Sequence, residues 1–598
     1  MDGTDIKSSK VAPTVQEQSV QSDVAVGESF NYQSAENSWL RRFLDTLRLE
    51  DKSVESSRWS NKGIPFAFTV MCKAASLIRG RPRPGSARTA HLAKSQLSAI
   101  PYLSLRGRSL TIKPDAAYWL CDAVAPGNLR LASSLVTTGL SWQAAIGAIA
   151  LGHFLISLAI TANGIIGARL HIPYTIQCRA PFGFYFSFVV VFIRMLVGFF
   201  WYGINTYTGA ECVHAVLVAI WPSFASLKNR LPASANITSQ MMIAYIVYFL
   251  IVLPFHAVHP RRLRLFFDAK VILCLPAMFG MLIWACRLEG NALRTPLMLR
   301  GNTVSGSEYS WAFLHALNAM LGSYGTMAVN INDFARYAKH TRSVFIQILI
   351  IPLSFSLLAY MGVIIAGCAS KQYGIEVWDP LTIMSYWTGS SEARAGAAFC
   401  GLAFTLAQLG TNISANCISA SNDLNAMFPR YINLRRGSYL IAFVGAWALT
   451  PWNILASASA LLNFMDGYTI WLAPIAGILL ADYWFIHRQS YNVSALYKPC
   501  AGYRYNRCGT NWRAVVAFVV GWGPLLPGFA QAVSATFSLP NGLAHLYDLG
   551  YLYGFFVSGT VYWLLNLAFP LAMPIDTDEA DIPVPSHVAI AAKAKLEV

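Results

Sequence analysis

Long apolar stretches dominate this sequence and limit the folds open to it. Twelve runs are long enough to cross a bilayer, which takes about 20 apolar residues. Only 12% of the 598 residues are charged and the mean hydropathy is +0.44, whereas a soluble domain carries roughly 25% charged residues. The runs lie at 116–137, 144–165, 184–218, 239–256, 270–287, 311–331, 344–368, 397–421, 439–456, 459–484, 514–535 and 547–571. The sequence therefore predicts an all-α polytopic membrane protein with about twelve transmembrane helices.

Basic residues are concentrated in every second predicted loop. The net charge of +16 could suggest nucleic-acid binding, but short cytoplasmic loops of membrane proteins are rich in Lys and Arg. The alternate loops carry Arg169, Arg179, Arg261, Arg262, Arg264, Arg336, Lys339, Arg342, Arg430, Arg435, Arg436, Arg488, Lys498, Arg504, Arg507 and Arg513. We therefore predict that these loops are cytoplasmic and that, with an even number of helices, both termini are cytoplasmic too. The pattern argues against nucleic acid as a partner.

The ends of the chain differ in composition from its apolar middle. Residues 1–57 are polar and rich in Ser, Gln and Glu, which predicts a disordered cytoplasmic tail and no signal peptide. Residues 58–113 alternate a short apolar run with basic, Pro-rich sequence, and two explanations remain open: an interfacial helix or a mis-joined coding segment. We predict a membrane domain over 114–572 and a cytoplasmic tail over 573–598. The eleven cysteines lie mostly in apolar segments, where cysteine acts as a small buried hydrophobe.

Two predicted helices carry helix-breaking residues beside polar groups. The first contains Asp122 followed by Pro126 and Gly127, and the sixth contains Ser323 and Tyr324 between Gly322 and Gly325. Helices one and six are five apart, which is the spacing of two inverted repeats of five helices whose interrupted members form a site near the membrane midplane. A glycine in a membrane helix is otherwise a packing position. The matched interruptions therefore predict a five-plus-five repeat with a central binding site.

The stretch AQLGTNISANCISASNDL, at 407–424, places many polar side chains at membrane depth. Such residues are costly there unless they face a bundle interior, a ligand or an aqueous pathway. Ala407, Gly410 and Thr411 share one helix face, where a hydroxyl and accessible carbonyls suit a hard cation. Asn416 lies about 140° from Thr411 at roughly 100° per residue, and its amide can both donate and accept. The alternative is that these small polar residues hold helices together.

Trp201 and Asn205 lie four residues apart in the third run, so they share a helix face. An aromatic plane beside an amide can stack a flat heterocycle while the amide pairs with its edge. Tryptophan is often an interfacial anchor, but Trp201 lies in the middle of its run. No HExxH, GxSxG or DxxD pattern occurs in the spans, which argues against an enzyme.

Six ordered segments carry a family resemblance. They are GARLHIPYTIQCRAPFGFYFS, WYGINTYTGAECV, LPASANITS, NINDFARYAKH, AQLGTNISANCISASNDL and FPRYINLRRGSY. Together they closely resemble the nucleobase–cation symporter-1 family, in its fungal branch of uracil, allantoin, uridine and thiamine permeases. The resemblance covers about 115–515 well and implies the leucine-transporter-like fold, with two helices added to the inverted repeats. The chain departs from the family pattern at 62–113 and around 125–130.

The resemblance also implies roles for individual positions. Substrate-binding positions match Trp201, Asn205, Ser323, Tyr324, Asn416 and Cys121, and cation-binding positions match Ala117, Leu120, Ala407, Gly410 and Thr411. Many relatives have glutamine where this chain has Asn205, so the reach of the amide is shorter here. Gly410 lacks one of the usual hydroxyls. Asp122 and Asp423 are the nearest carboxylates and are candidates for proton binding or gating.

We therefore expect a secondary active transporter of the plasma membrane that takes up a small planar heterocycle such as uracil, allantoin or uridine by alternating access. An uncharged ring gains nothing from the membrane potential, so its accumulation needs a co-moving cation. The fungal relatives indicate H+, with Na+ as the alternative, and we expect no cofactor and no metal beyond a possible sodium site. A thiamine or nicotinamide riboside permease is the alternative within the family. A membrane enzyme and a non-transporting receptor are more remote, and the expected partners are the heterocycle and membrane lipid, with no oligomeric state indicated.

Overall fold

The computed structural model describes residues 122–258, 264–289, 292–338, 340–497, 502–534 and 538–571. Within these ranges every regular element is a helix, of the α, 3₁₀ or π type. Several predictions lie outside the described residues, namely those for 1–57, 58–113, 573–598, Ala117, Leu120 and Cys121.

Eight helical segments in the described part of the chain are long and apolar enough to cross a membrane. They are Trp142–Leu170, Ser187–Ile220, Ala233–Ala257, Ala269–Leu288, Thr341–Tyr373, Ser391–Met427, Ala458–Ile486 and Trp512–Ser534. Each coincides with a predicted apolar run. The runs at 311–331, 439–456 and 547–571 contain shorter or interrupted helices, and the run at 116–137 begins outside the described residues. The described part therefore has the all-helical membrane character that the apolar runs predict.

Several α-helices begin or end at residues whose chemistry explains the boundary. In chain order they are α5 (Leu131–Val136), α6 (Trp142–Leu170), α7 (Tyr174–Gln177), α8 (Arg179–Phe182), α9 (Ser187–Ile220), α10 (Ser239–Val252), α11 (Arg264–Glu289), α12 (Pro296–Leu299), α13 (Gly306–Ser323), α14 (Gly325–Asn330), α15 (Asn332–Ala335), α16 (Gln347–Tyr373), α17 (Ser391–Thr411), α18 (Ile418–Met427), α19 (Leu434–Phe443), α20 (Ala458–Ala481), α21 (Val493–Leu496), α22 (Trp512–Trp522), α23 (Leu526–Ser534), α24 (Asn541–Asp548) and α25 (Gly550–Ala568). The hydroxyls of Ser141 and Ser390 accept from backbone N–H groups at the starts of α6 and α17, as N-caps do. α16 ends at Gly374, which has a left-handed backbone (φ 66°) that glycine adopts without steric cost.

Irregular backbone is found at both predicted interruptions. α13 ends at Ser323, and Tyr324 (φ −119°, ψ 13°) separates it from α14. Ahead of α5, Ala125 is extended (φ −125°, ψ 134°) and leads into the 3₁₀ helix η2 (Pro126–Arg130). Pro126 suits the start of η2 because its ring sets φ and it has no N–H to satisfy. The breaks in the sequence therefore predict the breaks in the structure.

The apolar run at 397–421 is a continuous helix with one widened turn. α17 passes into a π-helical segment, η10 (Asn412–Cys417), and then into α18. A π turn changes the helical repeat and is frequent at functional sites. The angle of about 140° between Thr411 and Asn416, which assumed a regular α-helix at roughly 100° per residue, therefore does not hold.

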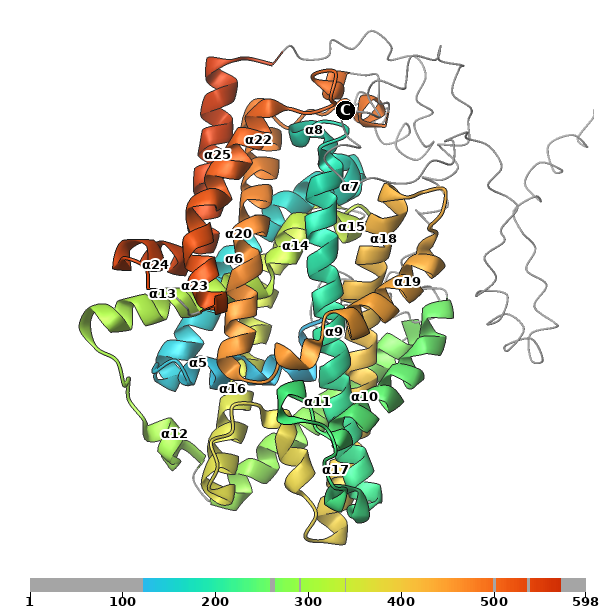
Figure 1. The fold of residues 1–598 in the computed structure, drawn as a ribbon, viewed down its shortest axis with the longest axis vertical. Helices are drawn as coiled ribbons and strands as arrows, with labels where there is room; N and C mark the ends of the chain where they lie inside the picture. Colours follow the sequence, from blue (N-terminus) through green and yellow to red (C-terminus); the bar gives the residue numbers. More distant parts are fainter. Residues whose placement is uncertain are drawn as a thin grey trace, which may run out of the picture. The chain divides into compact units, whose positions relative to one another are not determined.

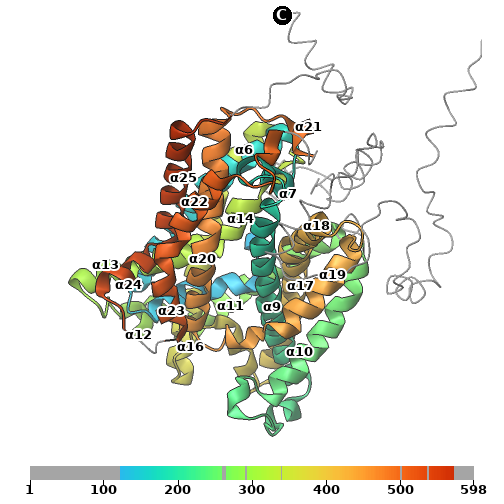
Figure 2. The same ribbon diagram turned by 45° about the horizontal axis from the view of Figure 1, so that its top comes forward.

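The helices pack in groups that Figures 1 and 2 both show. α20, α22 and α25 stand side by side, and α9 lies against α10 and α17. α6 packs against α13 and α16. Glycines permit the closest approaches, since a Cβ at Gly362 would lie 1.8 Å from the carbonyl oxygen of Leu129 and one at Gly322 would lie 2.7 Å from that of Met465. Small residues at helix contacts let the backbones of membrane helices approach closely.

Candidate functional site

The two interrupted helices, α9, α17 and η10 enclose one cavity. It is lined by Asp122, Ala125, Gly127, Asn128, Arg130, Leu131, Arg194, Gly198, Trp201, Ile204, Asn205, Thr208, Ser323, Tyr324, Thr326, Met327, Phe355, Thr411, Ala415, Asn416, Leu455, Leu461 and Met465. Its volume is about 110 Å³, against the roughly 10–15 Å³ that one water needs on the same measure. The cavity brings together most of the described residues that the sequence singles out, but it does not include Ala407, Gly410 or Asp423.

Trp201 and Asn205 line the cavity from one face of α9, one turn apart. Trp201 donates from Nε1 to the hydroxyl of Tyr468 at 3.3 Å, and Tyr468 donates to the carbonyl oxygen of Gly322 at 2.5 Å. The indole also meets the ring of Phe464 edge to face at 5.9 Å. These contacts hold the indole at the wall of the cavity and connect it to the break after α13.

The interruption between α13 and α14 presents Ser323 and Tyr324 to the cavity. The hydroxyl of Tyr324 donates to the carboxylate of Asp122 on the first helix. The Tyr324 ring lies edge to face against Phe355 at 4.7 Å, and Ser323 Oγ is 3.3 Å from Nε2 of the buried His153. The first helix and the sixth are therefore joined at their interruptions by a charge-assisted hydrogen bond.

Asn416 reaches the cavity from the π-helical segment η10. Its Nδ2 donates to Oδ1 of Asn412 at 3.2 Å. Asn412 is fully buried and donates in turn to the carbonyl oxygen of Tyr202 and to the Thr206 hydroxyl, both at 3.1 Å. Asn416 is thus a cavity residue whose amide is anchored to α9 through Asn412.

A lysine from another helix packs against the face of α17 that the sequence assigns to a cation. Thr411 lines the cavity, whereas Ala407 is fully buried beside it. Lys270, from α11, is 1% exposed and donates from Nζ to Thr411 Oγ1 at 2.6 Å. Thr411 donates onward to the carbonyl oxygen of Ala407 at 3.1 Å. The Lys270 side chain therefore lies against the hydroxyl that the sequence assigned to a cation.

Asp423 lies away from the cavity lining and is ion-paired. Arg194, which does line the cavity, donates to the Asp423 carboxylate and to the Ser419 hydroxyl. The side chains of Arg194 and Asp423 are 3% and 0% exposed. A buried charge is tolerated when it is paired and hydrogen-bonded in this way, so the Arg194–Asp423 pair joins α9 to α18 beside the cavity.

A sequence model described as "Permease for cytosine/purines, uracil, thiamine, allantoin" matches residues 106–554. The chain belongs to this permease family. An uncharacterized permease of Schizosaccharomyces pombe is 42% identical to it over 76% of this chain and 80% of its own length. The allantoin permease of Saccharomyces cerevisiae is 33% identical, and the uracil permease of the same yeast is 32% identical, each over 76% of this chain and 73% of the relative. The protein is therefore a membrane transporter of the nucleobase–cation symporter-1 family and not an enzyme.

Solved structures show the fold of the permease. The transporter Mhp1, of the nucleobase-cation-symport-1 family, has been solved in a closed conformation with bromovinylhydantoin bound. It matches with a TM-score of 0.58 and 21% identity over 76% of this chain and 93% of Mhp1. The inward-facing conformation of Mhp1 matches with a TM-score of 0.58 and 20% identity, over 77% of this chain and 91% of Mhp1. The permease thus shares the Mhp1 fold.

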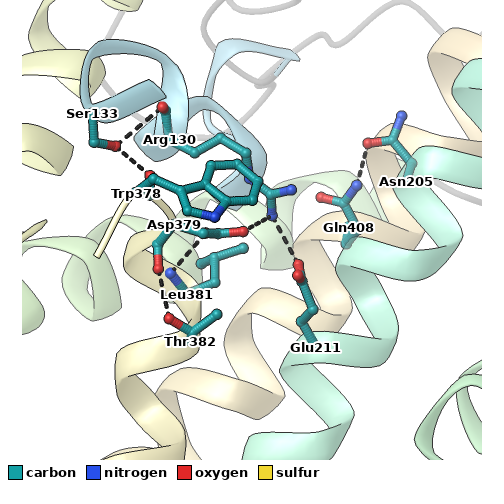
Figure 3. Close-up of polar contacts among 9 residues, drawn as sticks. All are labelled: Arg130, Ser133, Asn205, Glu211, Trp378, Asp379, Leu381, Thr382 and Gln408. Atoms are coloured by element: carbon teal, nitrogen blue, oxygen red, sulfur yellow. Dashed lines mark hydrogen bonds and ion pairs between the residues drawn. The ribbon is translucent and has the colours of Figure 1, made fainter. Parts of the chain in front are cut away.

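A buried ion cluster adjoins the cavity of the permease and was not predicted (Figure 3). Arg130 Nη2 lies 2.8 Å from Glu211 Oε2 and 2.9 Å from Asp379 Oδ2, with side chains 3%, 10% and 2% exposed. The guanidinium also lies 5.9 Å from the centre of the Trp378 ring, and Ser133 donates to the Trp378 carbonyl oxygen at 2.6 Å. Burial raises the pKa of the Asp379 carboxyl, although Arg130 opposes that shift. The cluster joins η2 to α9 and to the 3₁₀ helix η9 (Pro380–Tyr386).

Other polar residues near the site were also missed. Gln408, from α17, is fully buried and donates to Oδ1 of Asn205 (Figure 3). Lys270, Arg130 and Glu211 each lie in an apolar run. An ionisable residue inside a membrane span is a functional candidate by default, so that rule alone could have singled them out. Which partner each one meets could not be read from the sequence.

Proposed function

We propose that the permease couples inward movement of a cation to uptake of a small planar heterocycle, such as uracil, allantoin or uridine, at the plasma membrane. The proposal includes twelve transmembrane helices with a five-plus-five inverted repeat, cytoplasmic termini and alternating access to the central cavity. Its support is the family, in which S. cerevisiae relatives include an allantoin permease, a uridine permease and a uracil permease.

The cavity is the observation that carries the proposal. An indole and two amides, those of Trp201, Asn205 and Asn416, line the same space. An aromatic side chain can stack a flat ring, and amides can pair with adjacent carbonyl and N–H groups at its edge. The break at Tyr324 lies beside them, as expected for a site built on interrupted helices.

Thiamine and nicotinamide riboside are the alternative substrates, because S. cerevisiae transporters for both are 29% and 28% identical to this chain. Both molecules carry a cationic ring. Two guanidinium groups, of Arg130 and Arg194, line the cavity with one carboxylate, of Asp122. Both guanidinium groups are paired with carboxylates, Arg130 with Glu211 and Asp379 and Arg194 with Asp423, so the charge of the lining does not separate the two classes of substrate. We propose an uncharged ring because the allantoin and uracil permeases of S. cerevisiae are 33% and 32% identical to this chain, more than the transporters for the two cationic molecules.

For the coupling ion we propose H+ rather than Na+, with no cofactor. The ammonium of Lys270 is hydrogen-bonded to Thr411 and would repel a sodium ion there. Lys270 also attracts the charge of Asp122, and Asp122 accepts from Tyr324. The second oxygen of Asp122 is buried without a hydrogen-bond partner among the described residues. A proton on Asp122 would therefore change the contact between the two interrupted helices.

Uptake of radiolabelled uracil by cells that express the permease tests the substrate. We expect competition by allantoin or uridine and none by thiamine or nicotinamide riboside. Uptake of radiolabelled thiamine or nicotinamide riboside by the same cells, with no uptake of uracil, would favour the alternative. A permease that binds uracil and never accumulates it would be a receptor.

The same cells test the coupling ion. We expect a protonophore to abolish accumulation and replacement of external sodium to leave it unchanged. Accumulation that survives the protonophore and collapses without sodium would show that Na+ is the coupling ion.

A further inference from the structure

The orientation of the Asn416 amide follows from a chain of hydrogen bonds that ends on a backbone carbonyl. A carbonyl oxygen can only accept, so the Asn412 atom 3.1 Å from the Tyr202 oxygen must be the nitrogen Nδ2. The other end of the Asn412 amide is then Oδ1, which can only accept. The Asn416 atom 3.2 Å from it must therefore be Nδ2.

Thr206 completes this chain without ambiguity. Its hydroxyl donates to the same Tyr202 oxygen at 2.7 Å, so it is left with lone pairs and accepts from Asn412 at 3.1 Å. Asn412 is fully buried and Thr206 is 1% exposed. An amide turned the other way would leave buried polar groups without a partner, which would destabilise the folded protein. The network therefore holds the Asn412 amide in one orientation.

Asn416 is consequently turned with its nitrogen toward Asn412 and its oxygen at the opposite end of the amide. Asn412 takes one of the two N–H groups of Asn416, and the carbonyl oxygen of this cavity-lining residue keeps its acceptor capacity for a ligand. Asn205 is turned the other way. Its oxygen accepts from Gln408 (Figure 3), which leaves its NH₂ group for the cavity.

We propose that Asn412 is a positioning residue that directs the carbonyl oxygen of Asn416 toward the ligand. The permease would then select heterocycles that present a ring N–H to that oxygen. The inference rests on the proposed function of the cavity and adds the polarity of the edge that the site recognises. Asn205 contributes a donor for a ligand carbonyl. A ring with a carbonyl beside an N–H, as in a cyclic imide or ureide, satisfies both amides.

The test compares ligands that differ in the N–H. Inhibition of radiolabelled uracil uptake is measured for uracil, its N-methylated forms and its C-methylated forms, which have the same added volume. In the wild type we expect N-methylation at one ring nitrogen to weaken inhibition far more than C-methylation does. In Asn412→Ala the Asn416 amide can turn, so we expect this selectivity ratio to fall about tenfold, the size of one hydrogen bond to a neutral group.

Two further variants keep the test decisive. Asn412→Leu keeps the branched skeleton and the number of side-chain heavy atoms, so it opens no cavity at this buried position, and it should show the same fall. Ser414→Ala is the matched control, because Ser414 belongs to η10 and, within the described part of the chain, its hydroxyl bonds to the carbonyl oxygens of Gly410 and Thr411 alone. Its selectivity ratio should equal that of the wild type.

The outcomes separate this inference from the proposed function. Equal weakening of all ligands in both Asn412 variants, with an unchanged ratio, would mean that Asn412 only supports packing and would overturn the inference. A wild type that does not distinguish N-methylated from C-methylated uracils would overturn it as well. If the wild type takes up uracil but the selectivity ratio is the same in the wild type and the Asn412 variants, only the positioning role is refuted. If the wild type takes up no heterocycle at all, the proposed function is refuted.

Discussion

Trp201 lines the cavity and is held at its wall by Tyr468 and Phe464, so its substitution should act on the substrate. We expect Trp201→Ala to weaken uptake affinity by about 1–3 kcal/mol, the range for stacking of a base on an aromatic side chain. Trp201→Phe should retain part of that affinity because an aromatic plane remains. Phe200→Ala, next to it on α9 and outside the cavity lining, is the control. Normal affinity of Trp201→Ala at the cell surface would assign Trp201 to packing.

Lys270 is buried and donates a hydrogen bond from Nζ to the hydroxyl of Thr411. We expect Lys270→Met, which keeps the length of the side chain without its charge, to bind substrate but lose protonophore-sensitive accumulation. The reason is that the variant removes a basic group that acts electrostatically on Asp122. Lys228→Met, at an exposed site in the loop before α10, should accumulate substrate normally. Normal proton-driven accumulation by Lys270→Met would exclude the lysine from coupling.

Helix spacing predicted the positions of side chains correctly on α9 but not on η10. The spacing of Trp201 and Asn205 correctly places both on one face of α9, because helix geometry fixes which residues are neighbours at that distance. The angle assigned to Asn416 was wrong, because the π turn over Asn412–Cys417 interrupts the regular repeat. Nothing in the small polar residues of that segment distinguishes a π turn from an α turn.

At the scale of elements, the Arg130 cluster connects η2, α9 and η9. Arg130→Met would leave Glu211 and Asp379 buried without their cation. Breaking a buried pair by removal of one partner costs about 3–5 kcal/mol, so we expect a markedly lower melting temperature in detergent and less permease at the cell surface. Glu211→Gln should be milder because Asp379 still pairs with Arg130.

An exposed ion pair provides the control for this stability measurement. Arg300 lies 3.8 Å from Glu376, with side chains 42% and 69% exposed. Surface pairs contribute roughly 0–1 kcal/mol, so Glu376→Gln should melt like the wild type. A melting temperature of Arg130→Met equal to that of Glu376→Gln would contradict a structural role for the buried cluster.

At the scale of the whole molecule, two glycosylation sequons test the proposed orientation. Asn236 is exposed, just after the 3₁₀ helix at Ala233–Ala235, and lies in a loop with few basic residues. We expect it to carry a glycan, so that Asn236→Gln abolishes the mobility shift caused by a glycosidase. Asn492 lies in a basic loop, and its Oδ1 accepts from Ala495 N at 3.0 Å. Asn492→Gln should leave the shift unchanged. Loss of the shift in Asn492→Gln alone would show that the proposed orientation in the membrane is inverted.

The sequence by itself determined the membrane class, the helix interruptions and several of the polar and aromatic residues that line the cavity. Each of these depends on local properties: the length of an apolar run, the effect of Pro126 or of the Gly322–Gly325 pair on a helix, and the repeat that puts Trp201 beside Asn205. The break in the sixth run and the polar stretch at 407–424 also singled out Tyr324 and Asn416, which the structure brings to the same cavity. Family resemblance added Ala117, Leu120 and Cys121, which lie outside the described residues.

Only the tertiary structure decided how these residues are paired. Lys270 meets Thr411 from 141 positions away, and Asn412 meets Tyr202 from 210 positions away. Hydropathy and spacing describe which face a residue occupies on its own helix, but they do not say which helix packs against that face. The charge beside Thr411 and the direction of the Asn416 amide were therefore settled by helix packing, because a buried polar group takes its role from the partner that satisfies it.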